Sequence, residues 1–114
     1  MKRTRISYSP AQSITIKAEE NLSQFTFVNA EGKPCEDDQK SVSVAEIDWL
    51  KGDAASIVSL GTIAVATTTT INLGDNVAAA LGGKAKPAAP TSAVNGRALS
   101  ACTGEGYVKI LIVP

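Results

Sequence analysis

Side chains that could carry out acid–base or nucleophilic chemistry are sparse in this sequence. The chain of 114 residues contains no histidine, which removes the commonest general base and the commonest metal ligand. Its two cysteines, Cys35 and Cys102, are far apart and lack the spacing of a metal site or a redox pair. We therefore expect both to be reduced packing residues. We also expect a protein that is not an enzyme and that has no catalytic residue, cofactor or metal.

Three short motifs resemble ligand sites but lack the residues that such sites need. Gly104–Gly106 lacks the third glycine of a dinucleotide-binding turn, and Gly82–Lys84 lacks both the upstream glycine and the following Ser or Thr of a phosphate loop. Glu36–Asp38 could offer oxygens to a hard cation, but the interleaved ligands of a calcium loop are missing. We interpret the first two as turns and the third as a solvated acidic loop.

Two other motifs point to contacts with proteins. Asn95-Gly96 favours a turn with positive φ, which would place Arg97 at the start of a strand. Arg97 could then reach a carboxylate on a neighbouring chain, or it could be a charged strand end in water. Trp49 and Leu50 form a large apolar pair in a turn, which is either an interface anchor or a satellite core under the loop.

The charges are balanced overall but unevenly distributed. Eleven basic and eleven acidic residues give a formal net charge of zero, so we expect no nucleic-acid partner and no membrane partner. The first residues are basic and the stretch 31–53 is acidic, a layout that suits contact between like subunits or marks solvated loops. Apolar runs are too short for a signal peptide or a span, so we expect synthesis in the cytoplasm.

The segments expected to form the scaffold are short, apolar and separated by glycine turns. This pattern predicts an all-β fold, a small single-domain β-barrel or sandwich of about 7–9 short strands. The first residues show no apolar period and predict an extended N-terminal arm over 1–12, with the β-barrel domain over 13–114. The expected strands are 13–17, 24–29, 43–47, 55–60, 62–67, 77–81, 97–101 and 107–113.

Glycine and proline refine this prediction at three places. Segments 55–60 and 62–67 are close enough to be one strand bent at Gly61. Pro87 and Pro90 predict an irregular loop over 84–92, because proline cannot donate to a strand ladder. Segments 97–101 and 107–113 predict a hairpin around Gly104–Gly106, and the last strand is apolar enough to be central.

The order of these pieces resembles a known family over about three-quarters of the chain. The similarity lies in Phe27-Val28, Glu31–Lys33, Val44–Glu46, Lys51–Asp53, Val58–Val65, Leu73–Val77, Gly82–Ala85, Asn95–Ala101 and the valine-rich last strand. In this order they resemble the small capsid decoration, or cement, proteins of tailed bacteriophages. The basic arm, the acidic loop at 35–40 and the Pro/Ala loop at 84–92 depart from that pattern.

This resemblance implies a structural virion protein on the outer surface of the mature capsid. It would stabilise the shell by bridging subunits of the major capsid protein, as a homo-trimer at threefold positions, with an arm that can order along a neighbouring surface. The alternative is a β-rich head-fibre or tail attachment module that binds a host-surface glycan. The residues expected to contact the capsid or a neighbouring subunit are Lys2, Arg3, Arg5, Tyr8, Trp49, Leu50, Pro87, Pro90 and Arg97.

Overall fold

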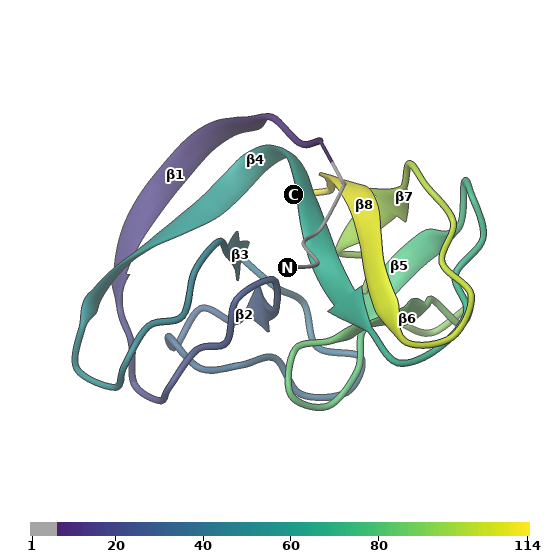
Figure 1. Ribbon diagram of the computed structural model, residues 1–114. Helices are drawn as coiled ribbons and strands as arrows, with labels where there is room; N and C mark the ends of the chain where they lie inside the picture. The colour runs from purple at the N-terminus through teal and green to yellow at the C-terminus, as the bar shows by residue number, and fades with distance from the viewer. Residues whose placement is uncertain (1–6) are drawn as a thin grey trace.

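The structure, a computed structural model, describes residues 7–114 and consists of strands joined by turns (Figure 1). This part of the chain contains no helix that is long and apolar enough to cross a membrane. The all-β prediction is confirmed. The strands are β1 (Pro10–Lys17), β2 (Phe27–Val28), β3 (Ser43–Ala45), β4 (Ala54–Thr67), β5 (Asn76–Ala79), β6 (Ala85–Pro87), β7 (Gly96–Ala98) and β8 (Gly106–Ile112).

Five of these strands close into a barrel in the order β4, β6, β5, β7, β8 and back to β4. The only parallel pair in this ring is β4 with β6, where Thr67 lies opposite Ala85. Strand β8 pairs with both β4 and β7 and forms the predicted hairpin with β7, so the most apolar segment is central, as expected. Strands β1, β3 and β2 extend the sheet outside the barrel along β4.

Strand β4 belongs to both parts of the sheet because it bends in the middle. Its first half pairs with β1 and β3, and its second half pairs with β8 from Thr62 to Thr67. The bend occurs at Gly61, which has a φ of +100°, a region that only glycine occupies without strain. The prediction of one strand bent at Gly61 is therefore confirmed.

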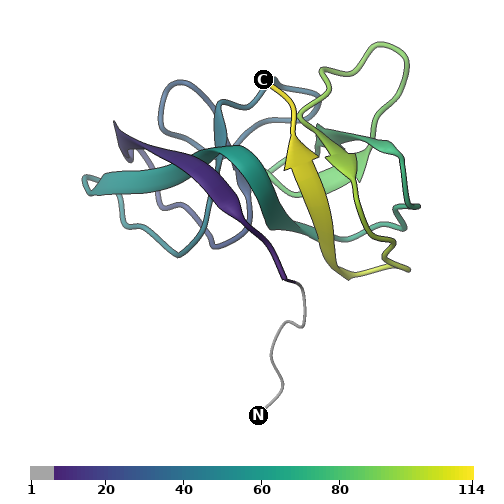
Figure 2. The ribbon, with the colours of Figure 1, turned by 90° about the horizontal axis from the view of Figure 1, so that it is seen from above.

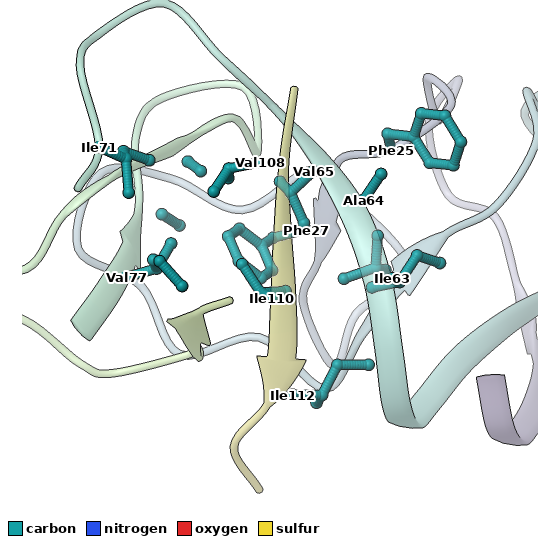
Figure 3. Close-up of a cluster of buried hydrophobic side chains, with 14 of the residues drawn as sticks. Phe25, Phe27, Ile63, Ala64, Val65, Ile71, Val77, Val108, Ile110 and Ile112 are labelled. Atoms are coloured by element: carbon teal, nitrogen blue, oxygen red, sulfur yellow. The ribbon is translucent and has the colours of Figure 1, made fainter. Parts of the chain in front are cut away.

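The main core fills the barrel and extends beneath β2 and β3. Cross-strand pairs such as Ile63–Ile110 and Val65–Val108 point inward, and Phe27 from β2 lies among them (Figure 3). Each such side chain contributes roughly 1.5–3 kcal/mol when fully buried. A smaller satellite core, built around Leu22 and Ile57, lies on the other side of the outer sheet.

Strand β2 covers only Phe27–Val28 of the expected segment 24–29, and the structure differs from the prediction at three further places. Strand β1 begins at Pro10, so residues 10–12, expected in the arm, belong to a strand. The loop predicted over 84–92 begins with a strand, β6, although Pro87 ends it. That strand can form because β4 pairs with β6 only at Ala85. Pro87 lies two residues beyond this position, so its missing N–H removes no hydrogen bond between β4 and β6.

The third difference concerns Asn95 and Gly96. Neither residue has the positive φ that the Asn-Gly turn predicted. Asn95 is instead fully buried, and Gly96 begins β7. A Cβ at Gly96 would lie 2.6 Å from Cδ1 of Ile110, so glycine is needed here for close packing against β8 rather than for a turn.

Candidate interaction surfaces

Of the residues singled out in the sequence, those that the structure describes do not gather into one site. Lys2, Arg3 and Arg5 lie outside the described residues. Leu50, Pro87, Pro90 and Arg97 are exposed, whereas Tyr8 and Trp49 are half-buried. Because the described residues of this set occupy the N-terminal segment, two separate loops, β6 and β7, they define several surfaces, which are built up below.

Tyr8 packs against the body of the domain rather than projecting from an arm. Its ring meets Phe25 edge to face with centroids 5.8 Å apart, and Phe25 meets Tyr107 in the same way at 5.6 Å. Such pairs add about 0.5–1.5 kcal/mol beyond the buried area. Burial, and then the nearby Glu46 carboxylate, raise the pKa of the Tyr8 hydroxyl. Tyr8 therefore covers the main core beside β8.

Trp49 and Leu50 have different environments within one loop. Trp49 packs against the satellite core, and its Nε1 is buried without a hydrogen-bond partner among residues 7–114. Leu50 remains 66 % exposed, and Ile47 in the same loop is 50 % exposed. Of the two alternatives for this pair, the geometry of Trp49 fits the satellite core, and Leu50 is the side chain available for contact.

Arg97 lies on the outer face of the β7–β8 hairpin. It is directly opposite Leu111, and the next pair on this face is made by Leu99, whose N–H donates to the Lys109 carbonyl at 2.7 Å. Leu99 and Leu111 are 41 % and 44 % exposed. Two basic residues and two leucines therefore alternate over one small face, and Arg97 is the only one of the four among the predicted contact residues.

The acidic loop after Cys35 is held by a lysine of strand β6. Lys86 Nζ lies 2.7 Å from Asp37 Oδ1 and 2.9 Å from Asp38 Oδ1. A hydrogen bond from the Ser92 hydroxyl, followed by one from Lys86, lowers the pKa of Asp38. Within residues 7–114 no cluster of three or more metal-ligating side chains occurs. Through Lys86 of β6 and the Ser92 hydroxyl, these carboxylates hold the segment that carries Pro87 and Pro90 against the acidic loop.

An apolar groove at the outer sheet was not anticipated from the sequence. Its lining includes Ile14 of β1, Leu60 of β4, Val42 and the C-terminal residues Val113 and Pro114. Strand β1 lies on the outside of the molecule against the first half of β4 (Figure 2). No single segment of the sequence carries this surface, because its lining comes from four distant positions in the chain.

The two cysteines differ in accessibility, which gives a direct prediction. Cys35 is fully buried, and burial raises the pKa of its thiol to about 12, whereas Cys102 is half-buried. Because the thiolate is the reacting species, a disulfide reagent should titrate one thiol per native chain and the second only in denaturant. The Cys102→Ser variant should show no rapid reaction. Rapid labelling of that variant would contradict the burial of Cys35.

Comparisons with known proteins bear on the fold. No family model matches the chain, and no curated protein matches it. Among solved structures, the head fiber gp8.5 N base of bacteriophage phi29 superimposes with a TM-score of 0.74. The match covers 90 % of this chain and 93 % of that chain, at 23 % sequence identity. The two chains share a fold. At this identity the likeness concerns the arrangement of the strands over nearly the whole length of both chains.

Proposed function

We propose that this chain is a structural protein of a phage virion that binds the outer surface of the mature capsid. In this role it stabilises the shell without catalysis, by bridging major capsid protein subunits as a homo-trimer. The observation that supports this proposal most strongly is the fold shared with a phage head fiber base over 90 % of the chain. A protein that binds only the expanded lattice stabilises that lattice by mass action.

The outer sheet offers a surface suited to such binding. Among the strands of residues 7–114, β1 pairs only with β4, so its other edge presents main-chain N–H and C=O groups to an incoming strand. Seven of its eight side chains are exposed, and the apolar groove opens beside Ile14. We propose that an extended segment of the capsid protein docks along this edge and places apolar side chains in the groove.

A second candidate is the base of a head fibre or an attachment module that binds a glycan. The fold shared with the head fiber base of bacteriophage phi29 favours the first of these two possibilities. Glycan binding has less support, because protein surfaces that bind sugars use exposed aromatic rings. Of the aromatic side chains in residues 7–114, only Tyr107 is exposed by more than 40 %. Binding to the outside of the phage head is common to the capsid-stabilising role and to the head-fibre base, but not to the glycan-binding attachment module.

Co-sedimentation with capsids tests the proposal. The protein is mixed with expanded heads and, separately, with unexpanded procapsids of the phage that encodes it. We expect saturable binding to expanded heads alone, at a fixed ratio to the major capsid protein. Ile14→Glu places a charge beside the groove and should weaken binding roughly tenfold or more.

The control is Leu81→Glu, since Leu81 is 76 % exposed and does not line the groove. This variant should bind heads like the wild type. Absence of binding to either particle would refute the capsid role, and a glycan screen would then test the attachment module. Equal binding by Ile14→Glu and wild type would refute only the placement of the contact at the groove.

A further inference from the structure

The outer face of the β7–β8 hairpin has the chemistry of a docking surface. Arg97 lies opposite Leu111, and Leu99 lies beside Lys109 through a main-chain hydrogen bond. The exposed leucines are thus surrounded by positive charge. Large apolar side chains on a charged surface favour a partner that supplies both apolar contact and carboxylates.

The β3–β4 loop, residues 46–53, carries the complementary chemistry. Ile47 and Leu50 are 50 % and 66 % exposed. Ile47 stands between Glu46 and Asp48 in the chain, and Leu50 follows Asp48 by two residues. This loop therefore presents two apolar side chains among carboxylates. It matches the β7–β8 face in its apolar residues and opposes it in charge.

The charged side chains of both surfaces form no salt bridge with another residue of the part of the chain that the structure describes. In residues 7–114, the salt bridges involve only Lys86 with Asp37 and Asp38. Arg97 and Lys109 on one surface, and Glu46 and Asp48 on the other, form none with this part of the chain. Each surface can therefore offer its charges to a partner without breaking an ion pair within residues 7–114.

The loop is also held in a fixed conformation before any partner binds. The Leu50 N–H donates to Asp53 Oδ2 at 2.8 Å, and the Lys51 N–H donates to Asn21 Oδ1 at 2.9 Å. The Gly52 N–H donates to the Ala18 carbonyl at 2.7 Å. Because these bonds order the loop in the free chain, little conformational entropy is lost when it docks.

We propose that two copies of this chain associate by seating the β3–β4 loop of one on the β7–β8 face of the other. The partner that docks on the β7–β8 face is a second copy of this chain, because both complementary surfaces are present on one chain. The contact uses two different patches, so every copy has one of each to offer. This inference goes beyond the proposed capsid role, because the association occurs in solution and stands whether or not the chain binds a shell.

Mixing two single variants provides the test. Leu50→Glu alters only the loop, and Leu111→Glu alters only the β7–β8 face. Both leucines are exposed, so both variants should fold, which melting curves check. In sedimentation velocity, wild type should exceed the monomer mass and each variant alone should be monomeric. An equimolar mixture should regain a complex, because it still contains one intact loop and one intact face.

The matched controls are Leu81→Glu, at a leucine that is 76 % exposed and lies in neither surface, and Ile14→Glu in the groove. Both should retain the mass of wild type. Because Ile14→Glu affects the capsid contact and Leu50→Glu affects the contact between copies, the two proposals fail separately. A wild-type protein that stays monomeric over the whole accessible concentration range would overturn this inference. So would a mixture of the two variants that stays monomeric.

The salt dependence of the affinity between copies tests the proposed pairing of Arg97 with the carboxylates of the β3–β4 loop. Arg97→Glu should weaken association between copies roughly tenfold at low salt, because it places like charges in contact. The difference in affinity from wild type should shrink as salt rises, since the Debye screening length falls to about 3 Å at 1 M salt. An affinity between copies that Arg97→Glu leaves unchanged at low salt would overturn the proposed pairing.

Discussion

Gly61→Ala should destabilise this protein by about 3 kcal/mol and loosen β1 from the sheet. Two physical effects add at this position. The φ of +100° is costly for a residue with a Cβ, by roughly 1–2 kcal/mol. A Cβ would also lie 2.5 Å from the Ala11 nitrogen and 2.6 Å from the Ser9 oxygen. Neither backbone atom can move away without displacing the N-terminal segment.

The displaced segment is one that the fold holds through Thr62. The Thr62 N–H donates to the Ser9 carbonyl at 3.1 Å, and the Ser9 N–H donates to the Thr62 hydroxyl at 2.8 Å. Urea unfolding should show the loss of stability. Relative to wild type, Gly61→Ala should accelerate amide hydrogen exchange more in β1 than in β8, because β8 is central in the barrel.

Gly52→Ala is the matched control, since Gly52 has a φ of +96° but no heavy atom within 4 Å of a Cβ built there. This variant isolates the cost of the backbone conformation, and we expect it to lose about 1 kcal/mol. Equal losses for the two alanine variants would contradict the role of the close approach between Gly61 and the N-terminal segment.

The second large effect is expected at Asn95, a fully buried amide. Its Oδ1 accepts from the Ser41 N–H at 2.9 Å, and its Nδ2 donates to the Gln39 carbonyl at 2.9 Å. Asn95→Ala leaves both main-chain groups without that partner inside the protein. Each unsatisfied group costs about 1–3 kcal/mol, so we expect a total loss near 3 kcal/mol.

Thermal and urea unfolding of Asn95→Ala measure this loss. Asn72→Ala is the control, because Asn72 is exposed and its side chain forms no hydrogen bond with another described residue; its stability should stay within about 0.5 kcal/mol of wild type. A loss at Asn95 as small as that at Asn72 would show that solvent replaces the two hydrogen bonds and that the site is less buried than the structure indicates.

These two positions illustrate what local sequence patterns can predict. The bend at Gly61 was predicted because a glycine between two β-forming segments has a local signature. The hairpin around Gly104 and the central place of β8 follow from turn residues and apolar content for the same reason. The buried role of Asn95 was missed, because its partners Gln39 and Ser41 are more than 50 residues away in the chain.

The candidate surfaces divide in the same way. Arg97 and Leu50 were named from the sequence, because a charged strand start and an apolar turn can be recognised locally. Leu111 and Leu99 were not named, because the face that they share with Arg97 exists only once β7 and β8 pair. The groove could not be predicted at all, since Ile14, Leu60 and Val113 come together only through tertiary packing.

The sequence by itself determined the all-β class, most of the strands and the bend in β4, because strand propensity and turn chemistry act over a few residues. Only the tertiary structure decided that β4 and β8 close a barrel, that β6 forms despite Pro87, and that β1 has no second partner among the strands of residues 7–114. These features depend on which distant strands pair, and pairing is determined by how side chains from many segments fill one common core.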